Sequence, residues 1–175
     1  MCSVWTVDNW LSLVTILFGV LGGYIAWRQL MLGNEIKREE NRIKRAELAK
    51  QIIEALRHDD EMVQTMSKID YETDDTRWYT EKTRFNGNNR FESAIDKLFS
   101  YMSYVIYLYE TENIAIEEFE LVVYKIRRIC NSKSSQDYLR YISRFSDKNE
   151  IPCSFKRLID YGLKMKWLPE DIIPA

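Results

Sequence analysis

The sequence is poor in the residues that build metal centres and covalent cross-links. It contains three cysteines and one histidine, and these form neither a CxxC pair nor a Cys/His cluster. An odd number of widely spaced cysteines, Cys2, Cys130 and Cys153, argues against a disulfide framework and against a structural zinc site. We therefore expect no metal, and we expect Cys130 and Cys153 to act as small apolar residues in a reducing compartment.

Signatures of catalysis and of nucleic-acid binding are also missing. The sequence contains no HExxH, P-loop, GxGxxG or GxSxG motif. Its single histidine, His58, stands beside charged residues and is expected to be a solvated helix residue rather than an acid or base. The net charge of −2 lacks the basic excess of general nucleic-acid binders. We expect no catalytic site, no cofactor and no nucleic-acid partner. An enzyme would need a cluster of acidic, basic and tyrosine side chains that spacing does not reveal.

One long run without formal charge lies near the N-terminus, at residues 9–27 (NWLSLVTILFGVLGGYIAW). At 1.5 Å per residue it spans about 28 Å, close to the ~30 Å hydrocarbon core of a bilayer. Its Leu, Ile, Val and Phe residues supply roughly −3 to −5 kcal/mol toward insertion. Trp10 and Trp27 suit the two interfaces, and Arg28 can reach the headgroups. The run predicts a transmembrane helix over residues 9–32. The alternatives are a buried core helix and a signal peptide, which normally has a basic start that is missing here.

The charges that flank this run predict its orientation. No Lys or Arg precedes the run, whereas seven occur between residues 28 and 50. The positive-inside rule then places residues 1–8 outside and the bulk of the chain in the cytoplasm. We expect a single-pass protein of a bacterial inner membrane, with the lipid bilayer as its first partner.

Small residues accompany the predicted membrane helix. Gly19 and Gly23 form a GxxxG pair, a pattern that lets two helix backbones approach closely. The strip of small residues is extended by Ser12, Thr15, Gly22 and Ala26. This favours self-association of the helix, and the alternative is that glycine is simply frequent in membrane helices.

A charged helical stalk is predicted over residues 33–70. The stretch from Glu35 to His58 has no proline or glycine and is rich in helix formers, whereas Gly33-Asn34 is a candidate hinge. Apolar content rises between residues 52 and 69, which indicates that the stalk docks there onto the domain that follows.

Residues 71–90 are expected to form a polar connection on the surface. They lack helical periodicity and contain the turn signal Asn86-Gly87. Trp78, Tyr79 and Phe85 are expected to pack against the domain, and the alternative is a loop that binds a partner.

The pattern of residues 91–175 predicts a small bundle of four helices. We expect them to start at a capping box of Asn89 and Glu92, near Glu117, at Ser134, and at Pro152–Ser154. The apolar stripes at three- and four-residue spacing are Phe91, Ala94, Ile95, Leu98, Phe99, Met102, Val105, Ile106 and Tyr109; Phe119, Val122, Val123, Ile126, Ile129 and Cys130; Tyr138, Leu139, Ile142 and Phe145; and Phe155, Leu158, Ile159 and Leu163, with Lys166 aligned to the last. The predicted fold is all-α: a transmembrane helix, a helical stalk and a small cytoplasmic helical bundle.

The first bundle helix carries more aromatic residues than one buried stripe needs. Tyr101, Tyr104 and Tyr107 accompany Phe99 and Tyr109. Tyrosine suits protein interfaces, so these three residues are a candidate partner surface. The alternative is a helix that is buried on two sides.

The layout resembles bacterial and phage-associated single-pass membrane proteins of unknown function. The closest local likeness is Leu108–Ile129, LYETENIAIEEFELVVYKIRRI, where an aromatic helix ends at an acidic residue and a second helix opens after an Ile-Ala step. The resemblance implies a membrane effector or an accessory subunit of a phage-defence system, and it supplies no catalytic residues. From the residues themselves, the leading hypothesis is a membrane-anchored interaction protein that binds a protein partner or itself.

Overall fold

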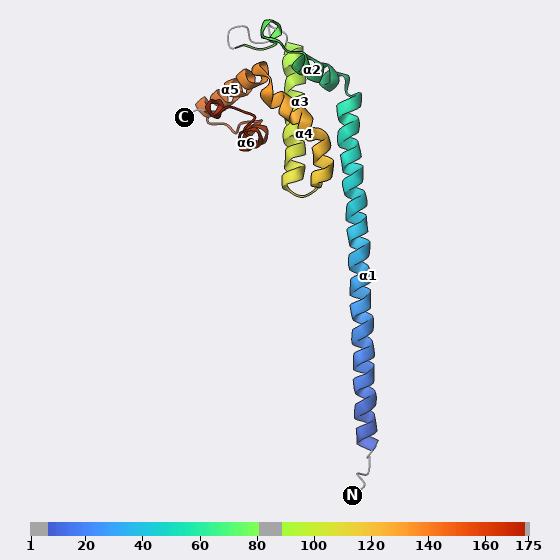
Figure 1. The fold of residues 1–175 in the computed structure, drawn as a ribbon. Coiled ribbons are helices and arrows are strands. Elements are labelled where there is room, and N and C mark those ends of the chain that lie inside the picture. Colours follow the sequence, from blue (N-terminus) through green and yellow to red (C-terminus); the bar gives the residue numbers. More distant parts are fainter. Residues whose placement is uncertain (1–6, 81–88, 174–175) are drawn as a thin grey trace. The chain divides into compact units, whose positions relative to one another are not determined.

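The computed structural model describes the backbone of residues 7–80 and 89–173, and the side chains of residues 17–80 and 90–173 (Figure 1). Within these ranges the regular structure is entirely helical and contains no strand, which confirms the predicted all-α class. The chain divides into two units, Met1–Lys44 and Arg45–Ala175.

The first unit contains the N-terminal part of helix α1, which begins at Val7 and ends at His58. The helix continues through Gly33 and Asn34, so the hinge expected there is absent from the described backbone. A glycine inside a helix costs only about 1 kcal/mol relative to alanine. The strong helix formers that follow it outweigh that cost. The predicted boundary between the span and the stalk therefore lies inside one helix.

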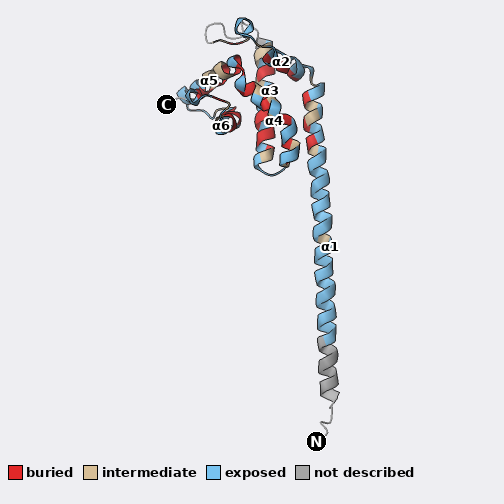
Figure 2. Ribbon diagram, viewed as in Figure 1, coloured by how far each residue is buried: buried red, intermediate tan, exposed pale blue. Residues whose placement is uncertain are grey.

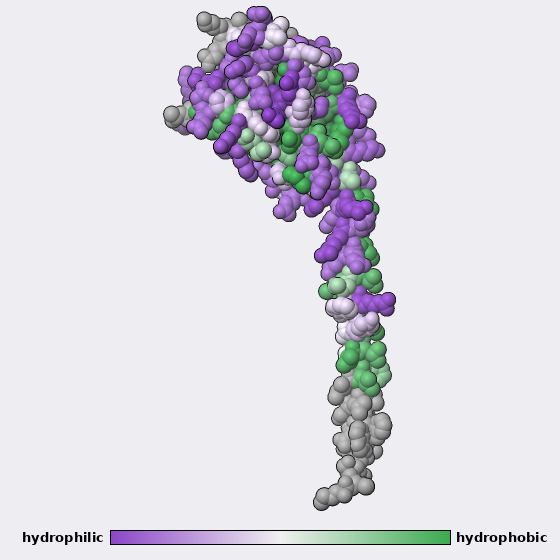
Figure 3. Space-filling model, viewed as in Figure 1, coloured by the Kyte–Doolittle hydropathy of each residue, from purple (hydrophilic) through white to green (hydrophobic). Residues whose placement is uncertain are grey.

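Large apolar side chains cover much of α1 in the first unit, and all of those described between residues 17 and 32 are exposed. Their exposed fractions range from 48% to 72%: Leu17, Phe18, Val20, Leu21, Tyr24, Ile25, Trp27, Leu30, Met31 and Leu32. Figure 2 colours this stretch as exposed, and Figure 3 shows its apolar surface. Within the described part of the chain, no helix is both long enough and apolar enough to cross a membrane.

The predicted membrane-anchor residues fall partly outside the described side chains. Trp10 and Ser12 lie outside them, as do Thr15 and Cys2. Trp27 is described and is 57% exposed, and Arg28 is exposed beside it.

The second unit is a helical bundle whose central helix, α3, contacts α2, α4 and α6, while α5 packs on α4 and η3 (Figure 1). Its elements after the end of α1 are α2 (Asp60–Asp70), η1 (Asp74–Thr76), α3 (Asn89–Glu110), α4 (Ile116–Asn131), α5 (Lys133–Lys148), α6 (Lys156–Lys164) and η3 (Glu170–Ile172). The predicted inward stripes of α3 and α4 are buried or half-buried throughout, as the 3.6-residue period requires.

Helix α2 is separate from α1, although one stalk was predicted over residues 33–70. The Asp59 side chain accepts a hydrogen bond from the Met62 amide at 3.1 Å and so caps α2. Residues from Arg45 onward belong to the second unit, and Ile52, Leu56 and Met66 lie in its core. The predicted docking between residues 52 and 69 is thereby confirmed.

Helix α5 departs from the sequence prediction at both ends. Its N-cap is Ser132, whose hydroxyl accepts from the Ser135 amide at 3.1 Å, so the helix starts before the predicted Ser134. Phe145, predicted to point inward, is 46% exposed. Buried Ser143 and Ser146 occupy the inner face there instead, and the ring of Phe145 lies 6.2 Å from that of Tyr141 on its own helix.

The connection after α2 is ordered against the bundle through residue 80. Tyr79 is 1% exposed, and its ring meets that of Tyr138 edge-on, with centroids 5.2 Å apart. Trp78 is half-buried and packs edge-on against Phe91, so the predicted tucking of both aromatics is confirmed. Phe85 and the capping side chain of Asn89 lie outside the described residues.

Candidate functional site

The three tyrosines of the predicted partner surface lie in different environments. Tyr101 is half-buried, and its hydroxyl donates to the Ile52 carbonyl at 3.4 Å, which ties α3 to the end of α1. Burial raises the pKa of Tyr101. Tyr104 and Tyr107 are 47% and 39% exposed, with ring centroids 6.5 Å apart. Two of the three residues therefore remain available as a partner surface, and the third serves packing.

A basic side chain from α6 completes the exposed tyrosine pair. The Arg157 guanidinium stands over the Tyr107 ring, 4.7 Å from its centroid, and donates to the Glu110 carboxylate at 2.7 Å. Aromatic rings joined to an arginine are frequent at the energetic centres of protein interfaces. We call Tyr104, Tyr107 and Arg157 the tyrosine face.

A cleft of about 390 Å³ lies beside the tyrosine face. Ser103 and Glu110 of α3 line it together with Cys153, Lys156 and Arg157, which lie in and before α6. Cys153 is a half-buried free thiol. Cys130, by contrast, is fully buried in the core, and burial raises its pKa to about 12. Both cysteines contact the hydrophobic core, as expected of small apolar residues, but only Cys153 also lines a cleft.

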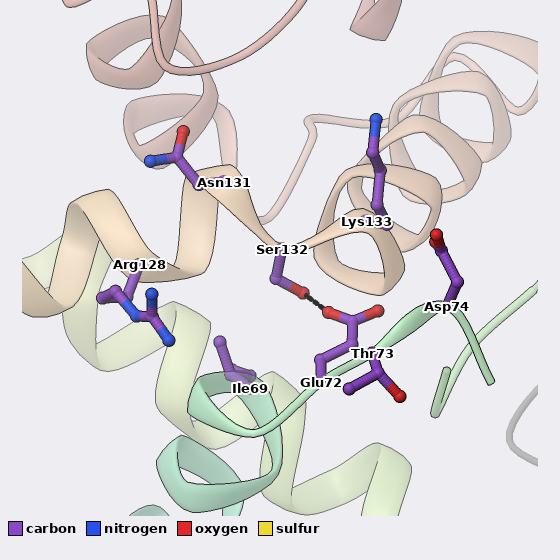
Figure 4. Close-up of a pocket in the computed structure, with 8 residues that line it drawn as sticks. All are labelled: Ile69, Glu72, Thr73, Asp74, Arg128, Asn131, Ser132 and Lys133. Atoms are coloured by element: carbon purple, nitrogen blue, oxygen red, sulfur yellow. Dashed lines mark hydrogen bonds between the residues drawn. The ribbon is translucent and has the colours of Figure 1, made fainter. Parts of the chain in front are cut away.

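A second cleft, of about 330 Å³, lies between the end of α2 and the start of α5 (Figure 4). The Glu72 carboxylate is the centre of its hydrogen bonds. It accepts from the hydroxyls of Ser132 and Ser134 and, at 2.9 Å, from the Ser134 amide. The Ser134 hydroxyl also accepts from the Tyr79 amide at 3.3 Å. We call this arrangement the Glu72 lock, because it fastens the 72–79 segment to α5.

Arg128, which lines the second cleft, is engaged with Asp70 at the end of α2. Arg128 donates from Nε to the Asp70 carboxylate at 2.8 Å and from Nη2 to the Asp70 carbonyl at 2.7 Å. The Glu72 carboxylate occupies the positive end of α5, where a helix attracts an anion. The cleft is thus a structural junction, which the sequence analysis did not identify.

Buried and paired titratable groups elsewhere serve packing. The Tyr138 hydroxyl donates to Asp96, and burial raises the pKa of both groups. Lys97 lies 2.6 Å from Asp59, and their hydrogen bond lowers the pKa of that carboxyl. Among the described residues, no group of His, Cys, Asp and Glu is arranged to hold a metal ion.

The glycines predicted for helix association are open in the first unit. A Cβ atom built at Gly19, Gly22 or Gly23 would meet nothing within 4 Å. At about 100° per residue, Gly19, Gly22 and Ala26 fall within one narrow sector of α1. Up to Trp27 the large apolar residues described lie outside this sector, so this part of α1 has one face of small residues, which we call its smooth face; Leu30 enters the sector one turn further on.

Comparisons with protein-family models, with curated proteins and with solved structures find no match to this chain.

Proposed function

We propose that this chain is a membrane-anchored interaction protein. Residues 9–27 insert into the bilayer, and the bundle formed by the second unit presents the tyrosine face to a protein partner. The observation that supports the anchor most directly is the exposure of all ten large apolar side chains described between Leu17 and Leu32.

The physical basis is the contrast between the two units. The second unit gathers most of its large apolar residues into a core, in which Ile95, Leu98 and Phe99 are fully buried. The first unit leaves its large apolar residues exposed from Leu17 to Leu32, which is about four helical turns. A helix that is apolar on most of its circumference needs a hydrophobic environment, and a bilayer supplies one. The proposed span also takes in residues 9–16, whose side chains lie outside the described part of the chain.

A charge introduced into the span tests the anchor. Replacing leucine by lysine near the centre of a membrane helix costs about 3–4 kcal/mol, which matches most of the insertion energy of this run. We expect the full-length chain to stay with membranes after an alkaline wash and L21K to be released. The matched control is L121K, because Leu121 on α4 is similarly exposed, 59% against 54% for Leu21. A wild-type chain that stays in the supernatant after high-speed centrifugation without detergent contradicts the proposal.

Cysteine labelling tests the orientation. In intact spheroplasts, a membrane-impermeant maleimide is expected to label Cys2 and to leave Cys153 unlabelled until detergent is added, since the proposal places them on opposite sides. Cys130 is fully buried and stays unlabelled in both conditions, so it serves as an internal control. Labelling of Cys153 without detergent contradicts the proposed topology.

The tyrosine face is tested by capture of partners from membranes. Double substitution Y104S/Y107S is expected to lose proteins that co-purify with the wild-type chain, because exposed tyrosines contribute contact area and hydrogen bonds. The matched control is Tyr124→Ser on α4, which is 66% exposed and lies outside the tyrosine face. Loss of the same proteins with Y124S, or their retention with Y104S/Y107S, contradicts this assignment.

A second candidate function is supported by the smooth face of α1. With Gly19, Gly22 and Ala26 in one sector and no side chain near the glycines, two copies could bring their backbones together within a membrane. Such an assembly would perturb the bilayer, as expected of an effector in a phage-defence system. In cells that express the chain, a potential-sensitive dye should then report depolarisation that G19I/A26I abolishes and V20I retains. A normal potential with the wild-type chain contradicts the effector role and leaves the adaptor.

A further inference from the structure

The cleft between α3 and α6 contains a thiol that the proposed function does not use. Cys153 precedes α6 and lines the cleft, and it is a half-buried free cysteine. The cleft volume of about 390 Å³ lies within the range of sites for small ligands. The whole cleft belongs to the second unit, and it is independent of how the first unit is anchored.

An unsatisfied hydroxyl lines the same cleft. Ser103 is 8% exposed, and its buried Oγ has no hydrogen-bond partner among the residues that the structure describes. Buried hydroxyl groups are normally paired, because leaving one unpaired is unfavourable. A ligand in the cleft that carries a carbonyl or carboxylate group would supply the missing partner once the Ser103 hydroxyl turns toward it.

Charges of both signs surround the thiol. Arg157 pairs with Glu110 at 2.7 Å, and Lys156 pairs with Asp160 at 3.3 Å. These side chains are about half exposed or more, so both signs are presented to solvent. A ligand with carboxylates and an ammonium group finds complementary charges here, whereas a neutral molecule of the same size does not.

We propose that this cleft binds a zwitterionic low-molecular-weight disulfide and that Cys153 forms a mixed disulfide with it. The Cys153 thiol loses its proton to solvent, and the thiolate attacks one sulfur of the bound disulfide. A new bond forms between the Cys153 sulfur and that sulfur, and the original S–S bond breaks. The second half leaves as a thiolate, so the disulfide is reduced and Cys153 is oxidised. The retained half keeps its polar groups near Ser103, Lys156 and Arg157.

The test compares a charged with a neutral disulfide. The full-length chain, in a Cys2→Ser background, is incubated with oxidised glutathione or with bis(2-hydroxyethyl) disulfide, and mixed-disulfide formation is followed by intact mass. Each rate is divided by the rate with the same reagent on the urea-unfolded chain. We expect the normalised rate with oxidised glutathione to exceed that with the neutral disulfide about five- to tenfold. This ratio corresponds to the interaction energy of about two exposed ion pairs between the protein and the ligand. Equal normalised rates overturn the proposal.

Variants locate the adduct and its recognition. C153S is expected to abolish the adduct, while Cys130 stays unmodified in the folded chain because it is fully buried. R157Q and S103A should slow the reaction with glutathione severalfold and leave the neutral disulfide unaffected. K133Q, which changes an exposed lysine of the other cleft, should alter neither rate. An adduct that forms on Cys130, or R157Q and S103A rates equal to wild type, overturns the assignment of this cleft.

Discussion

Removal of the Glu72 carboxylate should unfasten the segment after α2 from the start of α5. In E72A, the Ser134 amide and the hydroxyls of Ser132 and Ser134 lose their common acceptor. Hydrogen bonds to a charged acceptor contribute about 1.5–3 kcal/mol each where they are well shielded. Glu72 is only half-buried and water can replace part of the interaction. We therefore expect a loss of about 2–4 kcal/mol in the free energy of unfolding, well below the sum of three such bonds.

The conservative variant E72Q separates charge from geometry. The Gln carbonyl can still accept from Ser134, and the amide group can donate to the Ser132 hydroxyl, which then turns its own proton away. E72Q removes the charge and reverses the donor of one hydrogen bond, so the free energy of unfolding should fall by about 1 kcal/mol. Glu120 on α4 is exposed and provides the matched controls E120A and E120Q, which should change stability by less than about 0.5 kcal/mol.

Urea unfolding of the detergent-solubilised chain, followed by near-UV circular dichroism of the aromatic core, measures these differences. Hydrogen exchange gives a local reading, since the amides of Tyr79 and Ser134 should lose protection in E72A, whereas the amides of central α3 keep theirs. If E72A and E120A have the same unfolding free energy and Tyr79 keeps its protection, the lock does not hold the segment and the reasoning fails.

Two further predictions concern packing and pH. A methyl group at Gly162 would lie 2.7 Å from Leu168 Cδ1, so G162A should destabilise the second unit by about 1–3 kcal/mol in urea unfolding, whereas G33A, which meets nothing, should leave that unit unchanged. Equal urea-unfolding midpoints for G162A and G33A would contradict the close packing of Gly162 against Leu168. Asp96 has a folded-state pKa raised above 3.8 by burial, opposed by its bond from Tyr138, so its ionisation opposes folding. The wild type should therefore lose stability relative to D96N as the pH rises from about 3.5 through the raised pKa, and a pH-independent difference between their unfolding free energies would refute this.

The sequence predicted the positions of the helices better than the contacts that each helix makes with other parts of the chain. The stripe from Phe91 to Tyr109 was predictable because one buried face repeats every 3.6 residues and nineteen residues of pattern leave little ambiguity. The start of α5 was misplaced because three serines, at 132, 134 and 135, all resemble helix caps. Only the three-dimensional contact shows that Ser132 caps the helix while Ser134 binds Glu72.

The candidate sites were largely beyond the reach of sequence reasoning. Glu72 and Ser134 are separated by 62 positions, and nothing in their local patterns indicates that they meet. The same holds for Ser103 of α3 and Cys153, which precedes α6, although both line one cleft. The tyrosines were singled out correctly as unusual, but spacing alone could not show that Tyr101 serves packing while Tyr104 and Tyr107 stay exposed. Local periodicity encodes which face is inward, and it does not encode which inward faces meet.

The Ser134 hydroxyl, which receives one hydrogen bond from Tyr79 and passes another to Glu72, sets an order of events in folding. The native geometry of both bonds depends on the first turn of α5, because that turn positions the serine. We therefore expect the 72–79 segment to dock after this turn has formed, and the ring of Tyr79 to reach its place beside Tyr138 in the same step. A chain interrupted before that step would hold its helices and still leave the place of the Tyr79 ring open to water.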